Sequence, residues 1–140
     1  MKNRLVPLLA MALLGVAGGG PAFAADPAKA ETISVPSMSQ FDLLSRIQRK
    51  DPDLVVLDVR TPAEFAAGHV PGARNISHDL LQSSIEELSD LRNKQIVLYC
   101  RSGRRTMLAA EVLHKAGFKR LAHLEGDFLA WESEQRPIER

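Results

Sequence analysis

The residues with the clearest capacity for chemistry stand together between positions 100 and 105. The only cysteine of the chain is followed at once by a short basic stretch: Cys100, Arg101, Ser102, Gly103, Arg104, Arg105. A thiol becomes a nucleophile when it loses its proton, and nearby guanidinium groups favour the ionised form. Arginines this close together also repel one another unless an anion relieves the repulsion. We therefore expect Cys100 to be a nucleophile that acts on a small anion.

The segments on either side of this stretch would place it at the edge of a sheet. The apolar run 96–99 predicts a buried strand. Residues 106–116 have helical apolar spacing, carried by Met107, Leu108, Ala110, Val112 and Leu113. Backbone N–H groups and the helix dipole favour anions where a helix begins. A lone cysteine at a strand end can also be an ordinary core residue, but the neighbouring arginines would be costly in a core.

The rest of the chain alternates between strand and helix patterns. Further strands are expected at 32–35, 54–59, 73–76 and 121–124. Helices are expected from a cap at Ser37 or Ser39 to about 49, and at 62–67, 79–88 and 127–132. The inner faces of the first and third of these helices are predicted from apolar spacing to carry Phe41, Leu44, Ile47, Leu80, Leu81, Ile85 and Leu88. This order predicts an α/β fold with a mainly parallel sheet, in which ligands bind at the carboxyl ends of strands.

With these motifs the chain resembles the rhodanese-like domains, which are single-domain sulfurtransferases. Residues 100–105 match the family's active-site loop of the form C-R-x-G-x-R. An amino-terminal signature is matched by 57–60, 64–65 and 68–73, and a carboxy-terminal one by 117–118, 124–126 and Trp131. The resemblance covers residues 35–135. It implies a central, mainly parallel sheet with helices on both faces.

The resemblance also implies a reaction, in which Cys100 takes a sulfane sulfur from thiosulfate or a similar anionic donor. The persulfide would then pass its sulfur to a thiol, cyanide or a protein, without a cofactor. Substrate binding would fall to the rest of the loop, namely Arg101, Ser102, Gly103, Arg104 and Arg105. Two alternatives remain open: a phosphatase or arsenate reductase on a related fold, and a module that binds a partner or carries persulfide without catalysis. The phosphatase relatives resemble C-x5-R, whereas Cys100 and Arg105 give C-x4-R.

Other polar residues have weaker claims to a role in the site. Asp58 and Arg60 end a predicted strand near the loop and could support it, although an internal ion pair is the favoured interpretation. His69 matches a histidine that looks structural in the family. No spacing of histidines with Cys100 indicates a metal site. At Asp127 the chain departs from the family, where a second glycine is common, and we expect Asp127 to begin and cap a helix.

The amino terminus predicts export. Lys2 and Arg4 precede an apolar stretch, and residues 22–24 form an A-x-A cleavage site, so residues 1–24 are expected to be a signal peptide. The apolar stretch is short for a membrane span. Cleavage would leave a periplasmic protein without stable membrane insertion, composed of a lead-in segment (25–34), the domain (35–135) and a tail (136–140). Without Lys2 and Arg4 the chain has 16 basic and 17 acidic residues, which disfavours nucleic acid as a partner.

Overall fold

The computed structural model describes residues 32–140, so the predicted signal peptide and most of the lead-in segment lie outside the described residues. The described chain is built on a sheet of five strands in the order β1-β5-β4-β2-β3. Their bounds are β1 (Ser37–Met38), β2 (Leu54–Asp58), β3 (Arg74–Asn75), β4 (Gln95–Tyr99) and β5 (Leu121–Leu124). Each neighbouring pair in this order is parallel. The predicted mainly parallel sheet is confirmed.

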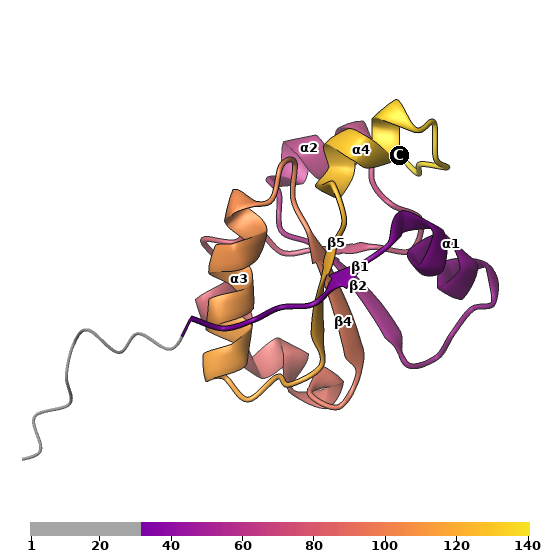
Figure 1. Cartoon of the computed structure of the whole chain (residues 1–140). Coiled ribbons are helices and arrows are strands. Elements are labelled where there is room, and N and C mark those ends of the chain that lie inside the picture. Colours follow the sequence, from indigo (N-terminus) through magenta and orange to yellow (C-terminus); the bar gives the residue numbers. More distant parts are fainter. Residues whose placement is uncertain (1–31) are drawn as a thin grey trace, which may run out of the picture. The chain divides into compact units, whose positions relative to one another are not determined.

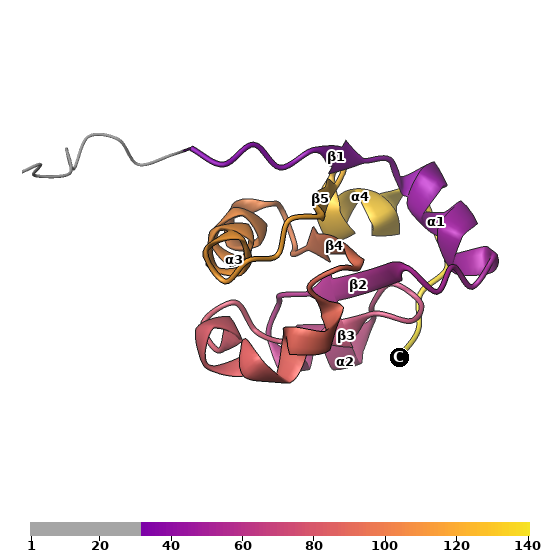
Figure 2. The ribbon, with the colours of Figure 1, turned by 90° about the horizontal axis from the view of Figure 1, so that it is seen from below.

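Helices cover both faces of the sheet, as predicted (Figures 1 and 2). They are α1 (Gln40–Gln48), α2 (Pro62–Ala67), α3 (Arg104–Lys115) and α4 (Asp127–Ser133), with two 3₁₀ helices, η1 (Leu81–Ser84) and η2 (Glu86–Leu91). The helix α3 and the 3₁₀ helices lie on one face, and α1 and α4 on the other. α2 and α4 lie at the top of Figure 1, at the end of the sheet where β4 gives way to the loop before α3.

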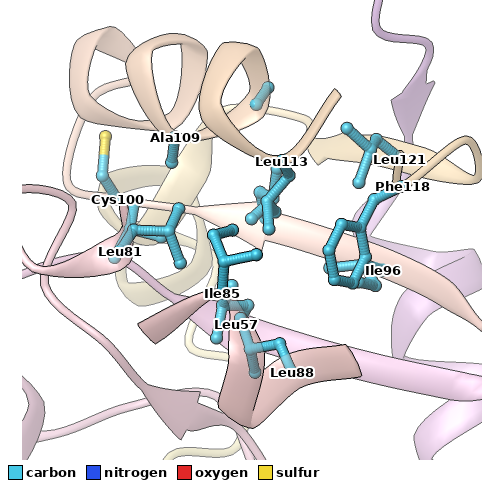
Figure 3. Packing of buried hydrophobic residues seen from close by; sticks show 13 residues of the cluster. Leu57, Leu81, Ile85, Leu88, Ile96, Cys100, Ala109, Leu113, Phe118 and Leu121 are labelled. Carbon is cyan, nitrogen blue, oxygen red and sulfur yellow. The ribbon is translucent and has the colours of Figure 1, made fainter. Parts of the chain in front are cut away.

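The central strand β4 divides the hydrophobic core into two layers. Ile96 and Leu98 point into a cluster with α3 and the 3₁₀ helices, whereas Val97 and Tyr99 point into a cluster with α1 and α4. This alternation follows from the two-residue period of a strand. A parallel strand covered on both faces is apolar throughout, which explains the continuous run that predicted it. Cys100 continues the first set and belongs to the first cluster (Figure 3).

Local sequence determines α2 almost completely. The Thr61 hydroxyl accepts the backbone N–H of Glu64 at 3.3 Å, and a carboxylate oxygen of Glu64 accepts the backbone N–H of Thr61 at 3.0 Å. This reciprocal capping box satisfies donors that would otherwise lack partners, and Pro62 fits the first helical position. The helix predicted at 62–67 is confirmed.

The helix predicted at 79–88 is wrong. The segment forms η1 and η2 instead, and Leu80, expected on the inner face, is 55% exposed. The backbone N–H groups of Ser83 and Ser84 both donate to the Leu80 carbonyl, at 3.1 and 3.2 Å, and both side-chain hydroxyls donate to the same oxygen. The burial of Leu81, Ile85 and Leu88 is nevertheless confirmed because short 3₁₀ turns place them on the core side.

Three smaller expectations also need correction. The first edge strand lies at Ser37–Met38 and not at 32–35. In α1, Phe41 is 69% exposed and Leu43 is buried instead, while Leu44 and Ile47 pack against the core as expected. Helix α3 begins two residues earlier than expected, and Met107 and Leu108 on it are exposed because Ala109, Ala110 and Leu113 make its inner face.

The predicted tail 136–140 packs onto the domain. The indole N–H of Trp131 donates to the Pro137 carbonyl at 2.8 Å, and Ile138 joins the α1–α4 core layer. The backbone of Glu139 pairs in antiparallel fashion with His69, with bonds of 2.9 Å in both directions. These contacts connect the end of the chain to the segment that follows α2. Between residues 32 and 140, no helix has the length and apolar character needed to cross a membrane.

Candidate active site

The cysteine loop occupies the junction between β4 and α3. Cys100 follows the last residue of β4, and the chain then turns through Gly103, whose φ of 111° favours glycine, into α3. This turn brings the Gly103 N–H to the Cys100 Sγ at 2.9 Å. The first N–H groups of α3 have no partner within the helix and add donors at the same place. The sulfur therefore lies where backbone N–H groups and the helix dipole favour negative charge.

The Cys100 side chain also packs against apolar residues. Only 1% of Cys100 is exposed, and its neighbours in the core layer include Leu81 and Ala109 (Figure 3). The two interpretations of a cysteine at a strand end therefore both describe this residue: its carbon side belongs to the core, while its sulfur accepts a loop N–H.

The structure separates the three arginines of the loop. Arg101 and Arg104 are exposed, whereas Arg105 is partly buried and bonds to Glu64 of α2 with both ends of its guanidinium, at 2.7 and 3.0 Å. These bonds lower the pKa of Glu64 to about 2 and are the main cause that raises the pKa of Arg105. A smaller rise in the pKa of Arg105 comes from the Cys100 sulfur, so Arg105 also lies close to the thiol.

Glu64 is a site residue that sequence reasoning missed. Its part in the α2 capping box was predicted, but local spacing does not indicate that the same carboxylate bonds to Arg105, which lies 41 positions away. A carboxylate at this position of α2 lies near the loop only because the sheet places α2 and the loop at the same edge. The one indication in the sequence was that Glu64 and the cysteine loop both belong to motifs of the family that the chain resembles.

Asp58 and Arg60 form the internal ion pair that the sequence favoured. The Arg60 Nη2 donates to Asp58 Oδ2 at 2.6 Å and to the Gly68 carbonyl at 2.7 Å, and Tyr99 donates its hydroxyl to the same Oδ2. The guanidinium also lies over the ring of Phe128, 4.0 Å from its centroid. Both partners are buried, so this pair supports the end of β2.

His69 lies in a structural setting. Its ring stacks on Phe65 at 3.7 Å between centroids, and its Nδ1 is 2.9 Å from the Phe65 carbonyl. Its Nε2 is 3.7 Å from a carboxylate oxygen of Glu139. These contacts use both ring nitrogens, and none of them involves Cys100. Among residues 32–140, no group of three or more His, Cys, Asp or Glu side chains is arranged to hold a metal ion.

A small hollow opens beside the loop, between α2 and α4. Its volume is about 150 Å³, and its lining includes Arg60, Glu64, Gly68, Arg101, Phe128 and Glu132. The hollow has both signs of charge and an aromatic wall. It offers space for a small polar molecule next to the first arginine of the loop.

Asp127 does not cap α4. Gly126 precedes that helix without a side-chain cap, and the Asp127 carboxylate turns instead toward the cysteine loop. There it accepts the backbone N–H of Cys100 at 2.9 Å. The expectation of a helix cap at this position is therefore wrong.

Comparisons with known proteins identify the family of this domain. The family model of the rhodanese-like domain matches residues 39–134. A protein named "Sulfurtransferase" from Allochromatium vinosum is 35% identical over 86 residues, which is 61% of this chain and 78% of that relative. The chain belongs to the rhodanese-like domain family, and relatives with assigned names include sulfurtransferases. Several longer relatives are matched over only 21–26% of their length, so their whole activities do not transfer to this chain.

Solved structures show the same fold. A rhodanese-related protein from Thermoplasma volcanium is 29% identical, with a TM-score of 0.64 over 74% of this chain and 97% of that chain. A Rhodopseudomonas palustris protein of unknown function, described as a "Possible Tyrosine Phosphatase", is also 29% identical. Its TM-score is 0.67 over 75% of this chain and 85% of that chain. The fold therefore leaves the choice between sulfur and phosphoryl chemistry to the loop.

Proposed function

We propose that the protein is a thiosulfate sulfurtransferase that works through a persulfide on Cys100. The observation that carries the proposal is the Gly103 N–H bonded to Sγ at the start of α3, inside the loop motif of the family. A backbone donor at the start of a helix favours negative charge on the sulfur, and the arginines of the same loop would attract an anionic donor.

The reaction has two balanced steps. In the first, the Cys100 thiolate attacks the outer sulfur of thiosulfate, the S–S bond of the donor breaks, and sulfite leaves with the bonding electron pair. In the second, cyanide or a thiolate attacks the outer sulfur of the persulfide, and the Cys100 thiolate is restored. This is a covalent, ping-pong cycle. The cycle needs no cofactor because Cys100 itself carries the sulfur from the donor to the acceptor.

The loop supplies different help in each step. Exposed Arg101 and Arg104 attract the dianionic donor, and Arg105, oriented by Glu64, lies next to the reacting sulfur. Backbone N–H groups at the start of α3 stabilise the charge that the persulfide carries. The hollow beside Arg101 provides room from which the acceptor approaches.

The size of the loop favours sulfur over phosphate. From Cys100 to Arg105 the spacing is C-x4-R, and Gly103 already bonds directly to Sγ. Donors converge on a volume close to one additional sulfur atom, so a tetrahedral phosphoryl group would meet them poorly. Loss of one such donor costs about 3 kcal/mol in comparable sites.

The decisive experiment is mass spectrometry of the protein after incubation with thiosulfate. We expect one added sulfur on Cys100, removed again by cyanide, and no addition in the matched Cys100→Ser variant. In the cyanide assay, Cys100→Ser should lose more than about a hundredfold in rate, since it lacks the covalent nucleophile. A serine variant that retains more activity than this contradicts the covalent mechanism.

A second experiment separates the enzyme alternatives. Wild-type protein should turn over thiosulfate and cyanide repeatedly and should hydrolyse an aryl phosphate or reduce arsenate only at trace rates. Insertion of one glycine between Ser102 and Gly103 should reduce sulfur transfer by widening the loop. Comparable aryl phosphate hydrolysis by the wild type overturns the assignment, and a single transfer without turnover supports a passive persulfide carrier.

We further propose that the domain works in the periplasm after removal of residues 1–24. The support is the sequence pattern of that segment. Full-length protein with a carboxy-terminal tag should appear in the periplasmic fraction with its chain beginning after Ala24. Recovery of the intact amino terminus from the membrane fraction contradicts this proposal and indicates an uncleaved anchor.

A further inference from the structure

Asp127 is buried in an unusual backbone conformation against the cysteine loop. It is 2% exposed, and its φ is 52°, in the left-handed region that is unfavourable for most residues with a side chain. In the rhodanese-like family, glycine is common at this position. A residue with a side chain keeps this backbone conformation only where the surrounding contacts hold it there.

The Asp127 carboxylate bonds to both ends of the loop. Its Oδ1 accepts the backbone N–H of Cys100 at 2.9 Å and the hydroxyl of Thr106, in the first turn of α3, at 3.1 Å. The first residues of α4 continue this attachment, because the Phe128 N–H donates to the Cys100 carbonyl at 3.0 Å and the Leu129 N–H to the Arg101 carbonyl at 3.2 Å. The start of α4 thus fixes both sides of the Cys100 backbone.

His123 of β5 completes the arrangement. Its Nε2 lies 2.7 Å from Asp127 Oδ2, a distance at which the nitrogen donates a hydrogen bond to the carboxylate when it carries a proton. The bond to Asp127 is the main cause that raises the pKa of His123. The pair also lies directly against Gly103, where an added Cβ would stand 3.1 Å from Asp127 Oδ2 and 3.7 Å from His123 Nε2.

We propose that Asp127 and His123 form a positioning pair for the sulfur-transfer reaction. Asp127 holds the loop so that the Gly103 N–H stays aimed at Sγ, and His123 in its protonated form offsets the carboxylate so that it does not repel an anionic donor. The inference rests on the proposed function for its kinetic consequence. Its structural and electrostatic consequences can be measured without any sulfur transfer.

The other charged groups near the sulfur stay constant in the variants below. They are Arg105 with its partner Glu64, the exposed Arg101 and Arg104, and the buried Arg60 with its partner Asp58. Differences among variants of the pair therefore report on the pair itself.

The electrostatic half is tested by alkylating the single cysteine with iodoacetate, which is anionic, and with iodoacetamide, which is neutral. The ratio of the two rates cancels changes in thiol ionisation and access, and reports the potential at Sγ. Below the pH at which His123 loses its proton, Asp127→Asn should raise this ratio and His123→Gln should lower it, each about threefold or more for one nearby charge. The double variant should return toward the wild type, and exposed Glu125→Gln is the matched control for loss of one negative charge.

The positioning half is tested with Asp127→Gly against Asp127→Asn. Asparagine keeps an oxygen for the Cys100 N–H, whereas glycine suits the positive φ but loses every side-chain bond. We expect Asp127→Gly to lower kcat of sulfur transfer about tenfold with a smaller effect on the thiosulfate KM, and Asp127→Asn to stay within about threefold of wild-type kcat.

Either of two results overturns the inference: alkylation ratios unmoved in Asp127→Asn and His123→Gln, or wild-type kcat in Asp127→Gly. If Asp127→Gly does not fold, the ratios of the other variants still decide. If wild-type protein forms no persulfide, the proposed function fails, while the alkylation ratios still test the pair.

Discussion

Two arginine–carboxylate pairs lie near the active loop, and they differ mainly in burial. Arg60 and Asp58 expose 4% and 0% of their side chains, whereas Arg105 and Glu64 expose 24% and 31%. Both pairs include contacts of 2.7 Å or less. Their surroundings decide what each one does.

The buried pair has no freedom left. Asp58 also accepts the Tyr99 hydroxyl, and Arg60 also reaches the Gly68 carbonyl and lies over Phe128. The pair of Arg105 and Glu64 is only partly buried and therefore remains partly solvated. In the proposed function, Arg105 would exchange part of its bonding to Glu64 for an incoming anion. The same chemistry supports the fold in one place and would serve binding in the other.

The largest effect should come from breaking the buried pair. Asp58→Asn leaves Arg60 buried without its counter-charge and should lower the free energy of unfolding by about 3–5 kcal/mol. Denaturant unfolding followed by Trp131 fluorescence measures this. The matched change Glu64→Gln should cost less than about 1 kcal/mol, because the pair is partly solvated. Equal costs for the two variants contradict the distinction between the pairs.

The next largest effect concerns binding. Arg105→Ala should raise the apparent thiosulfate KM about tenfold, and Arg105→Lys should raise it less because a charge remains near the sulfur. Steady-state kinetics with cyanide as acceptor measures both, and unfolding curves check that the fold is intact. Negligible changes in KM for both variants would assign Arg105 to the solvated surface.

The pair of Glu64 and Arg105 should also make the free energy of unfolding depend on pH in acid. The pKa of Glu64 is lowered from 4.5 to about 2, so its stabilising contribution is complete above pH 4.5 and is lost as the pH falls toward about 2. The unfolding free energy of wild type should exceed that of Glu64→Gln by up to about 1 kcal/mol at neutral pH. If the difference between wild type and Glu64→Gln stays constant down to a pH of about 2, the ionised carboxylate of Glu64 is not its source.

The smallest effect should come from the partly buried pair of His123 and Asp127. Because folding raises the pKa of His123 above 6.5, its contribution is complete below that pH and is lost as the pH rises through the raised value. The unfolding free energies of wild type and His123→Gln should therefore converge on the alkaline side. The expected difference is below about 1 kcal/mol. If the two unfolding free energies instead move apart as the pH rises, folding lowers the pKa of His123 and the prediction is wrong.

Sequence patterns were sufficient for several elements whose structure follows from neighbours along the chain. The α2 capping box, the strand 121–124 and the parallel arrangement are examples, since capping, periodicity and alternation are local signals. The helix predicted at 79–88 was wrong because two short 3₁₀ helices bury Leu81, Ile85 and Leu88 equally well, so apolar spacing does not distinguish the two structures. The choice of Leu43 over Phe41 depends on how α1 meets the sheet, which spacing alone does not fix.

The candidate site shows the same division. The loop and the internal ion pair of Asp58 with Arg60 were predicted from residue types close in sequence. The contacts of Glu64 with Arg105 and of Asp127 with Cys100 span 41 and 27 positions and depend on side-chain direction. The positive φ of Asp127, which turns its carboxylate toward the loop, leaves no mark in a single sequence.

The pairing of the first strand with the last has a consequence for the timing of folding. β1 bonds only to β5 in the sheet order, and Glu139 pairs with His69 near the middle of the chain. A partly synthesised chain lacks β5 and the closing segment, so neither β1 nor the end of α2 has its partner. Contacts of such long sequence separation form late. The domain therefore completes its fold only after residue 139 has been made, and such a delay would suit the export proposed above.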